Sequence, residues 1–279
     1  MDIDHRKGGW QPDLPDHRDY LVGHDAVRNL LERLKPAPAD APPRVDWREF
    51  CTPVQDQGGL PTCCVHACIA LVQYFERRAT GRILRPSRLF IHANAERLLG
   101  QPPDHGVSLR AVLKSLVCLG GPPEEYWPYD PAALARRPPT FTYGFARRFN
   151  KIRFLRLDAR HSGGEEVLEE MRSFLAAGFP SVLGYPVSTA VTQEPEIPYP
   201  AVFDGIRGGM AALAVGYDDN IRVHSEKGAL LIRNSWGADW GDHGYGWLPY
   251  RYLRERLAID VWTLMKRSWI NSGEFHRPI

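Results

Sequence analysis

The sequence predicts an α+β fold, with helices in the first half of the chain and strands in the second. Between residues 63 and 78, apolar residues recur at helical spacing, and the pattern stops at Gly81. After residue 180, short runs of β-branched and apolar residues alternate with turn residues. The chain has 279 residues, of which 43% are hydrophobic, so it is long enough to bury the core that such a fold needs.

The same apolar spacing predicts three more helices, at about residues 87–99, 108–119 and 165–177. Four strands are expected at about 181–187, 210–217, 229–233 and 246–248, and a C-terminal tail follows them.

The N-terminal region differs in composition from the rest of the chain. Residues 1–23 are rich in Asp, Pro and aromatic residues and are expected to form an extended arm. A short helix over 26–34 should follow, with apolar residues on one face. A stiff linker then contains four prolines: Pro36, Pro38, Pro42 and Pro43.

Charged residues are balanced and dispersed. The 35 basic and 33 acidic residues give a formal net charge of +2 without any run of like charges, so neither nucleic acid nor a membrane surface is expected as a partner. Five cysteines, three of them within six positions, do not form the pattern of a secreted disulfide framework. With no signal-like segment at the N-terminus and no stretch of membrane-spanning length, we expect a cytoplasmic protein.

Cys63 is predicted to begin the first long helix, after a loop at 54–62 that contains Gln57. At a helix N-terminus, the dipole and the unpaired amide groups favour the thiolate form of a cysteine. Two more motifs follow far downstream: Gly-Gly-Met-Ala-Ala-Leu-Ala-Val-Gly-Tyr-Asp-Asp at 208–219, and Arg-Asn-Ser-Trp-Gly at 233–237.

In order and spacing, these three motifs resemble the nucleophile, histidine and asparagine regions of the papain family of cysteine peptidases. The resemblance extends to residues 9–20, 45–48, 106–109 and 126–130, as in bacterial members. It implies a two-lobed fold with a cleft between the lobes. Fewer than fifty residues precede Val45, so a long helical propeptide is not expected. The implied divisions are an arm and linker at 1–43, a peptidase domain at 44–279, a helical lobe at about 55–150 and an antiparallel, β-barrel-like lobe at about 151–279.

The resemblance implies catalytic roles for three residues: Cys63 as the nucleophile, Gln57 as an oxyanion donor, and Asn234 as the residue that orients the histidine. Three residues would line the substrate side of the cleft: Gly59, Gly209 and Trp236. Each role has a structural alternative. A cysteine in an apolar helix is often a small core residue, Gln57 would otherwise be a surface glutamine, and Asn234 a polar residue at a strand end.

Met210 stands where the resemblance requires the catalytic histidine. A thioether neither accepts nor donates a proton, so Met210 marks a degenerate histidine position. Positioned proton transfer contributes about 10²–10⁴-fold, and amide cleavage depends on it most because the leaving amine must be protonated. The alternative base is His66, one helical turn after Cys63, but its side chain is expected to point into the helical lobe. The other histidines considered lie in no comparable motif: His92, His105, His161, His224 and His243.

The loop before Cys63 departs from the family pattern in other ways. Pro61 and Thr62 replace the usual Gly-Ser, and Pro61 removes an amide donor close to where a substrate backbone would lie. The sulfur atoms of Cys63, Cys64 and Met210 would suit Cu(I), but Cys64 is expected to point away along the helix. We therefore expect no metal and no cofactor, and Met210 is interpreted as apolar filling.

Three functional hypotheses follow, each with a peptide, protein or small acyl substrate in the cleft between the lobes. The first is a pseudopeptidase that binds without hydrolysing. The second is an enzyme in which Cys63 takes up an acyl group and transfers it, for example to an amine. The third is an ordinary cysteine peptidase that naturally has a histidine at position 210, where a methionine has been introduced artificially. The reactivity of Cys63 distinguishes the first two, because only an acyl-transfer enzyme needs an activated thiol.

Overall fold

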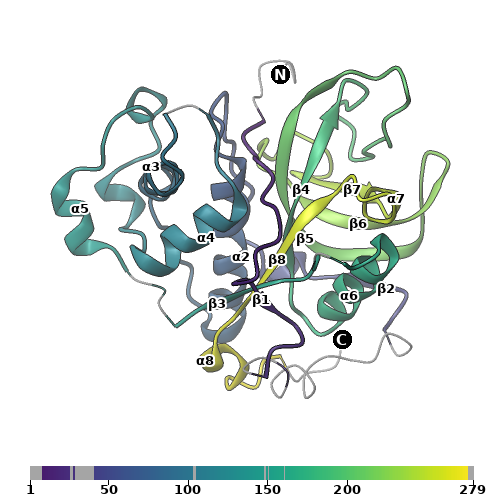
Figure 1. Cartoon of the computed structure of the whole chain (residues 1–279), viewed down its shortest axis with the longest axis horizontal. Coiled ribbons are helices and arrows are strands. Elements are labelled where there is room, and N and C mark those ends of the chain that lie inside the picture. The colour runs from purple at the N-terminus through teal and green to yellow at the C-terminus, as the bar shows by residue number, and fades with distance from the viewer. Residues whose placement is uncertain are drawn as a thin grey trace.

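The computed structural model describes residues 8–25, 28, 41–102, 105–147, 149, 151–159 and 161–275. Helices gather on one side of the molecule and a sheet on the other, and the N-terminal arm runs between them (Figure 1). The predicted two-lobed α+β fold is confirmed. The helix expected over 26–34 and two linker prolines, Pro36 and Pro38, lie outside the described residues, apart from position 28.

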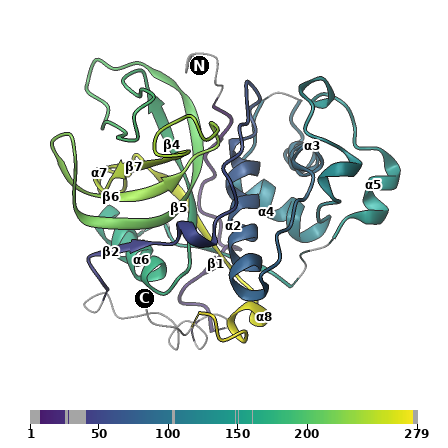
Figure 2. The ribbon, with the colours of Figure 1, turned by 180° about the vertical axis from the view of Figure 1, so that it is seen from behind.

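Helix α2 (Cys63–Thr80) stands between the two lobes. All of its residues from Cys63 to Glu76 are buried, because it packs against α3 and α4 on one side and against β5 on the other (Figure 2). It ends at Gly81, whose φ of 71° is the left-handed conformation that glycine adopts without strain. The sequence had predicted both ends of this helix to within two residues.

Two further helices complete the helical lobe, α3 (Arg88–Leu99) and α4 (Leu109–Cys118). Each begins after a serine whose hydroxyl accepts a backbone N–H, from Phe90 to Ser87 at 3.3 Å and from Ala111 to Ser108 at 3.2 Å. Short helical segments follow: η4 (Glu124–Tyr126), η5 (Pro131–Ala133) and α5 (Thr140–Phe145). No helix among the described residues is long and apolar enough to cross a membrane.

The other lobe is an open sheet in the order β1-β3-β8-β4-β5-β6-β7, with β2 also paired to β5, and so the described strands do not close into the barrel-like form that was expected. All pairs are antiparallel except β1 with β3. The strands are β1 (Tyr20–Leu21), β2 (Arg44–Asp46), β3 (Arg153–Arg156), β4 (Ser181–Ser188), β5 (Ile206–Val223), β6 (Glu226–Arg233), β7 (Tyr245–Pro249) and β8 (Ile259–Met265). The remaining helical segments are η3 (Arg48–Phe50), α6 (Gly164–Ala176), α7 (Arg251–Arg254) and α8 (Arg267–Ile270).

Four strands of this sheet were not predicted: the short strands β1 and β2, and the longer strands β3 and β8. The expected C-terminal tail contains β8, which pairs with both β3 and β4. Its charged residue Asp260 is fully buried, and so is Arg156 of β3. Buried charges break the apolar pattern by which strands are predicted, so only their pairing in three dimensions reveals β3 and β8.

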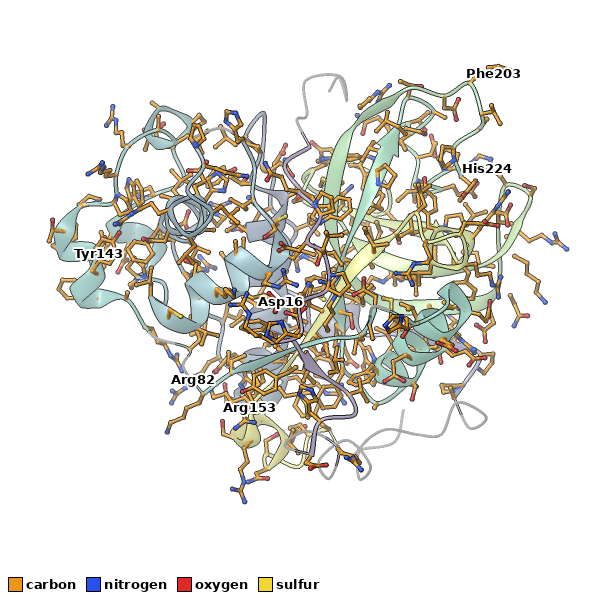
Figure 3. All side chains as sticks on the ribbon, in the orientation of Figure 1. Asp16, Arg82, Tyr143, Arg153, Phe203 and His224 are labelled. Carbon is orange, nitrogen blue, oxygen red and sulfur yellow. The ribbon has the colours of Figure 1, made fainter. Side chains whose placement is uncertain are left out.

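The arm is extended, as predicted, and it is part of the fold. Trp10 forms a parallel bridge with Val107, and β1 pairs with β3. Asp16, which is labelled in Figure 3, lies in the stretch of the arm between these two contacts. Phe203, labelled in the same figure, lies in the loop between β4 and β5, away from the arm. The arm therefore contacts both lobes along the line where they meet.

Candidate active site

Cys63 is the first residue of α2, and its side chain is 0% exposed. Burial raises the pKa of its thiol, but hydrogen bonds from the Cys64 thiol and from the amides of Ala211, Gly9 and Cys64 outweigh this effect, so the pKa lies below its ordinary value. Because Ala211 belongs to β5 and Gly9 to the arm, the sulfur is surrounded by both lobes and by the N-terminal segment.

Cys64 does not point away from Cys63, contrary to the expectation. Its thiol donates to the Val107 carbonyl at 3.0 Å and also lies within hydrogen-bonding range of the Cys63 sulfur. Burial and the adjacent Cys63 raise the pKa of Cys64 well above its ordinary value. Cys63 is therefore the thiol of this pair that ionises first. Among the described residues, no group of three or more His, Cys, Asp and Glu could hold a metal ion.

Gln57 is fully buried and connects the two lobes, so it is not a surface glutamine. Its Oε1 accepts from the Ser235 hydroxyl at 2.6 Å, and its Nε2 donates to the Leu60 carbonyl at 2.8 Å. The Gln57 amide also donates to the Ser235 carbonyl at 2.8 Å. These bonds hold the loop before Cys63 against the end of β6.

Asn234 follows β6 and is 4% exposed. Its Oδ1 accepts from the Ser235 amide at 2.8 Å, and its Nδ2 has no hydrogen-bond partner among the described residues. Trp236 is buried beside it and meets Trp240 edge to face, with ring centroids 5.2 Å apart. Gly59, by contrast, is exposed in the loop before α2.

Met210 lies on β5 opposite Tyr185 of β4, and its side chain is 0% exposed. It directly precedes Ala211, whose amide is one of the donors to the Cys63 sulfur. The residue predicted to stand at the histidine position is thus adjacent in the chain to a residue that contacts the predicted nucleophile, Cys63.

His66 lies where the two lobes meet, so the expectation that its side chain points only into the helical lobe is wrong. Its ring meets Tyr129 edge to face at 5.4 Å, and burial together with the nearby Arg88 lowers its pKa well below the ordinary value, so the imidazole is neutral. Its Nε2 has no partner among the described residues. His66 and Asn234 both line a cavity of about 10 Å³, which is room for a single water molecule.

The arm crosses the site directly over Cys63, which the sequence reasoning did not foresee. Trp10 donates its amide to the Gly209 carbonyl at 3.1 Å, and the Gly9 carbonyl accepts from Val107 at 2.9 Å. A Cβ on Gly9 would lie 2.2 Å from the Pro61 carbonyl oxygen, so only glycine fits there. In the sequence, two consecutive glycines before an aromatic residue, Gly8 and Gly9, were the feature that could have predicted this close approach of the two backbones.

Charged contacts secure the rest of the arm. Arg110 of α4 makes a two-pronged contact with the Asp19 carboxylate, at 3.0 and 2.7 Å, and lies 3.1 Å from Asp13. Arg156 of β3 donates to the Asp13 carbonyl at 3.0 Å. Two-pronged arginine–carboxylate pairs are among the stronger charged contacts, so the arm is held by both lobes.

Asp260 of β8 anchors the arm's tryptophan. Its Oδ2 accepts from Trp10 Nε1 at 3.0 Å, and its Oδ1 accepts from Trp262 Nε1 at 2.7 Å. Burial raises the pKa of Asp260 to about 6, although both indoles and the Arg156 charge oppose the rise. A carboxyl whose pKa is higher in the folded state stabilises the protein in acid, and this contribution is lost as the pH rises through about 6.

The Asp260→Asn variant tests this titration. Asparagine tolerates the positive φ of position 260 and carries no charge. The free energy of unfolding of the parent should fall from pH 4 to pH 7 as Asp260 ionises, whereas that of the variant lacks this fall, so the difference between the two should shift in favour of the variant by up to about 3 kcal/mol. Urea unfolding of both proteins at four pH values measures the difference. A difference that does not change with pH would mean that Asp260 titrates normally.

Comparison with known proteins identifies the family. A family profile described as "Papain family cysteine protease" matches residues 185–256. An uncharacterised peptidase C1-like protein of Acanthamoeba polyphaga mimivirus is 30% identical over 280 residues, covering 94% of this chain and 87% of its own length. The chain belongs to the papain family of cysteine peptidases.

Solved structures of papain-family proteins agree with this assignment. Xylellain, a cysteine protease from Xylella fastidiosa, is 31% identical, with a TM-score of 0.73 and coverage of 94% of this chain and 97% of that one. The bromelain protease from Ananas comosus, in complex with the E64 inhibitor, is 16% identical with a TM-score of 0.57 and supports the fold alone. It covers 81% of this chain and 100% of that one.

Proposed function

We propose that this papain-family protein is a pseudopeptidase that uses the cleft between its lobes to bind a peptide segment. The proposal depends on Met210, which the order of the motifs assigns to the family's histidine position and which directly precedes Ala211, whose amide contacts the Cys63 sulfur. A thioether cannot protonate a leaving amine, so the step on which amide hydrolysis most depends has no proton donor there.

We infer that, among the described residues, no other histidine takes over the role that a histidine at position 210 would have. His66 is buried and held neutral, and its ring contacts Tyr129 edge to face. Positioned proton transfer is worth about 10²–10⁴-fold, so we expect peptide hydrolysis to be reduced by at least that factor relative to a family member with an intact site.

The arm supports the binding half of the proposal. It lies in the cleft as an extended segment, joined to Val107 and Gly209 by backbone hydrogen bonds. Backbone pairing of this kind accepts a peptide chain irrespective of most of its side chains. A cleft that holds the protein's own segment in this way is equipped to hold a segment from another chain.

One observation favours a second candidate, an enzyme in which Cys63 takes up and transfers an acyl group. Hydrogen bonds from the amides of Ala211 and Gly9 lower the pKa of Cys63, and a thiolate can attack a thioester without a general base. Thiolate leaving groups need no protonation, so the missing histidine matters less for such substrates.

The test compares an amide and a thioester of the same peptide, incubated with the Gly9→Ala variant so that the arm does not block the site. A pseudopeptidase leaves both substrates intact and binds them, as measured by mass spectrometry and fluorescence anisotropy. Acyl transfer would appear as a mass increase on Cys63 with the thioester alone. Amide turnover that disappears in the Cys63→Ala variant would contradict both proposals.

A further inference from the structure

A cavity of about 530 Å³ opens on the helical lobe, and its volume is that of a typical small-molecule site. We call it the side pocket. Its floor is made by apolar side chains, namely Ile69, Leu84, Pro86 and Phe149. Among the described residues that line it, none is Cys63, Met210 or Asn234, so it is separate from the candidate active site.

Backbone hydrogen bonds between loops hold the walls of the side pocket in place. Gly121 and Arg147 bond to each other in both directions, at 3.2 and 3.1 Å. The amide of Glu124 donates to the Arg85 carbonyl at 2.8 Å. All four residues line the pocket, so its shape exists before a ligand arrives and binding requires little ordering of the protein.

The polar side chain on the floor of the side pocket already has its hydrogen bonds. Gln73 of α2 accepts from the Thr52 hydroxyl at 2.9 Å and donates to the Leu84 carbonyl at 2.6 Å. The apolar body of a ligand can therefore lie against Ile69 and Phe149 without leaving the Gln73 amide unpaired.

Aromatic side chains are exposed at the mouth of the side pocket. Tyr126, Phe141 and Phe145 are 38%, 53% and 57% exposed, and the ring centroids of Tyr126 and Phe145 are 4.9 Å apart. Phe145 ends α5, at the outer edge of the helical lobe, and lines the pocket (Figure 1). Clustered apolar groups on a surface mark binding sites more often than single ones do, and Phe145 offers a ring for an aromatic ligand.

The charged residues of the side pocket favour an anion. Three arginines and two glutamates line it, which leaves a net positive charge. Arg88 and Glu124 neutralise each other through N–H bonds of 3.1 and 2.9 Å. Arg85 has no ion pair within the described part of the chain, and Glu125, the remaining acid, opposes only one of the two other arginines.

Arg147 supplies a second guanidinium group to the side pocket. Its side chain is 50% exposed, and its Nη2 lies 3.8 Å from Glu76 Oε2. Glu76 Oε1 already accepts from Lys266 at 2.8 Å and from Trp269 at 3.1 Å. Glu76 therefore keeps a close cationic partner when Arg147 turns to a ligand, and guanidinium groups bind carboxylates well.

We propose that the side pocket is a binding site for a small aromatic carboxylate. The ring lies on the apolar floor beside Phe145, and the carboxylate contacts Arg85 and Arg147. This inference goes beyond the proposed use of the cleft for peptide binding and does not depend on it.

The experiment titrates the full chain with 1-naphthaleneacetate by isothermal titration calorimetry. The matched ligand is 1-naphthaleneacetamide, which has the same ring without the charge. Arg85→Gln and Arg147→Gln each remove one cation, and Phe145→Ala removes the aromatic wall. The control variants are Arg82→Gln and Phe203→Ala, because both side chains are exposed and neither lines the pocket (Figure 3).

We expect the acid to bind at least about 10-fold more tightly than the amide, because hydrogen bonds to a charged group are stronger than neutral ones. Arg85→Gln should weaken binding of the acid by about 5- to 10-fold while the affinity of the amide stays within about twofold, and Arg147→Gln should act in the same direction. Phe145→Ala should weaken both ligands by about threefold or more, because both lose the aromatic contact. The two control variants should leave both affinities unchanged.

Equal affinity for acid and amide, no binding, or a preference for the acid that survives both arginine variants would overturn the inference, provided that circular dichroism shows folded protein. Binding of the acid that ignores both arginine variants but becomes tighter with Gly9→Ala would place the ligand in the cleft and would equally exclude the side pocket. None of the pocket variants alters the cleft, so a cleft that fails to bind peptide would contradict the pseudopeptidase and leave the side pocket standing.

Discussion

Introducing Met210→His into a chain that also carries Gly9→Ala is expected to raise kcat/KM for peptide amide hydrolysis by about 10²–10⁴-fold. Other residues predicted to form a papain-type site lie near this position. The amide of Ala211 donates to the Cys63 sulfur, and Ala211 lines the same small cavity as Asn234. An imidazole at position 210 could hold the thiolate as an ion pair and protonate the leaving amine.

The measurement is initial-rate hydrolysis of a fluorogenic peptide amide. Met210→Leu in the same background is the matched control, since leucine fills a similar apolar volume without titrating, and it should leave the rate unchanged. Adding Cys63→Ser should abolish whatever activity the histidine creates. If the histidine variant is no faster than the leucine variant, then more than the missing base separates this site from a working peptidase, and the Pro61 loop becomes the next suspect.

Release of the arm should expose Cys63, and we expect Gly9→Ala to accelerate its alkylation by iodoacetamide by about 10²-fold. In the closed arrangement the side chain of Cys63 is 0% exposed. The added methyl group would meet backbone atoms of Pro61, which cannot move aside without displacing the loop. Loss of the backbone hydrogen bonds of Gly9 and Trp10 should destabilise the closed position of the arm by about a further 1–3 kcal/mol. Each 1.36 kcal/mol changes the population of molecules with the arm released tenfold.

Two internal comparisons make this labelling experiment selective. Gly23→Ala is the matched control, because a Cβ there meets nothing within 4 Å, and it should leave the Cys63 rate unchanged. Cys118 is the exposed cysteine among five free ones, so its labelling rate, mapped by mass spectrometry, reports general reagent reactivity. Cys63 labelling as fast as Cys118 in the unmodified chain would show that the arm does not cover the site in solution.

The pH dependence of Cys63 alkylation also reports the pKa of the Cys63 thiol. Hydrogen bonds from the amides of Ala211, Gly9 and Cys64 and from the Cys64 thiol lower the pKa of Cys63, so the Gly9 amide is one of the donors. In the Gly9→Ala variant the displaced arm no longer contributes, so the apparent pKa should be higher than in the closed protein, with Ala211 and Cys64 as the remaining donors. An unchanged pKa would mean that Gly9 contributes little to stabilising the thiolate.

Local patterns in the sequence were sufficient for most helices and strands. Ser87 and Ser108 cap α3 and α4 at the predicted starts of these helices, and Gly81 ends α2. Strands β4 to β7 were predicted because apolar and β-branched runs alternate with turns. The strands β3 and β8 escaped prediction because Arg156 and Asp260 interrupt the apolar pattern, and part of what stabilises each lies far away in the chain, at the Asp13 carbonyl and Trp10 respectively.

Motif spacing likewise predicted the surroundings of the site. Gln57 is bonded to Ser235, next to Asn234, and so the loop before Cys63 and the end of β6 meet across 178 residues of chain. The assignment of Met210 to the histidine position came from the order of motifs. The catalytic roles of these residues stay predictions, which the variants above are designed to test.

The sequence by itself determined the α+β class, the family resemblance, the helix that begins at Cys63 and the absence of a titratable side chain at position 210. These depend on local spacing and on side-chain chemistry, both readable along the chain. Only the tertiary structure decided that the arm lies over Cys63 and that Trp10 bonds to Asp260, 250 residues away. That contact depends on Gly184 and Gly209 leaving room for a ring, and the space between distant segments is a property of the packed fold that no local pattern carries.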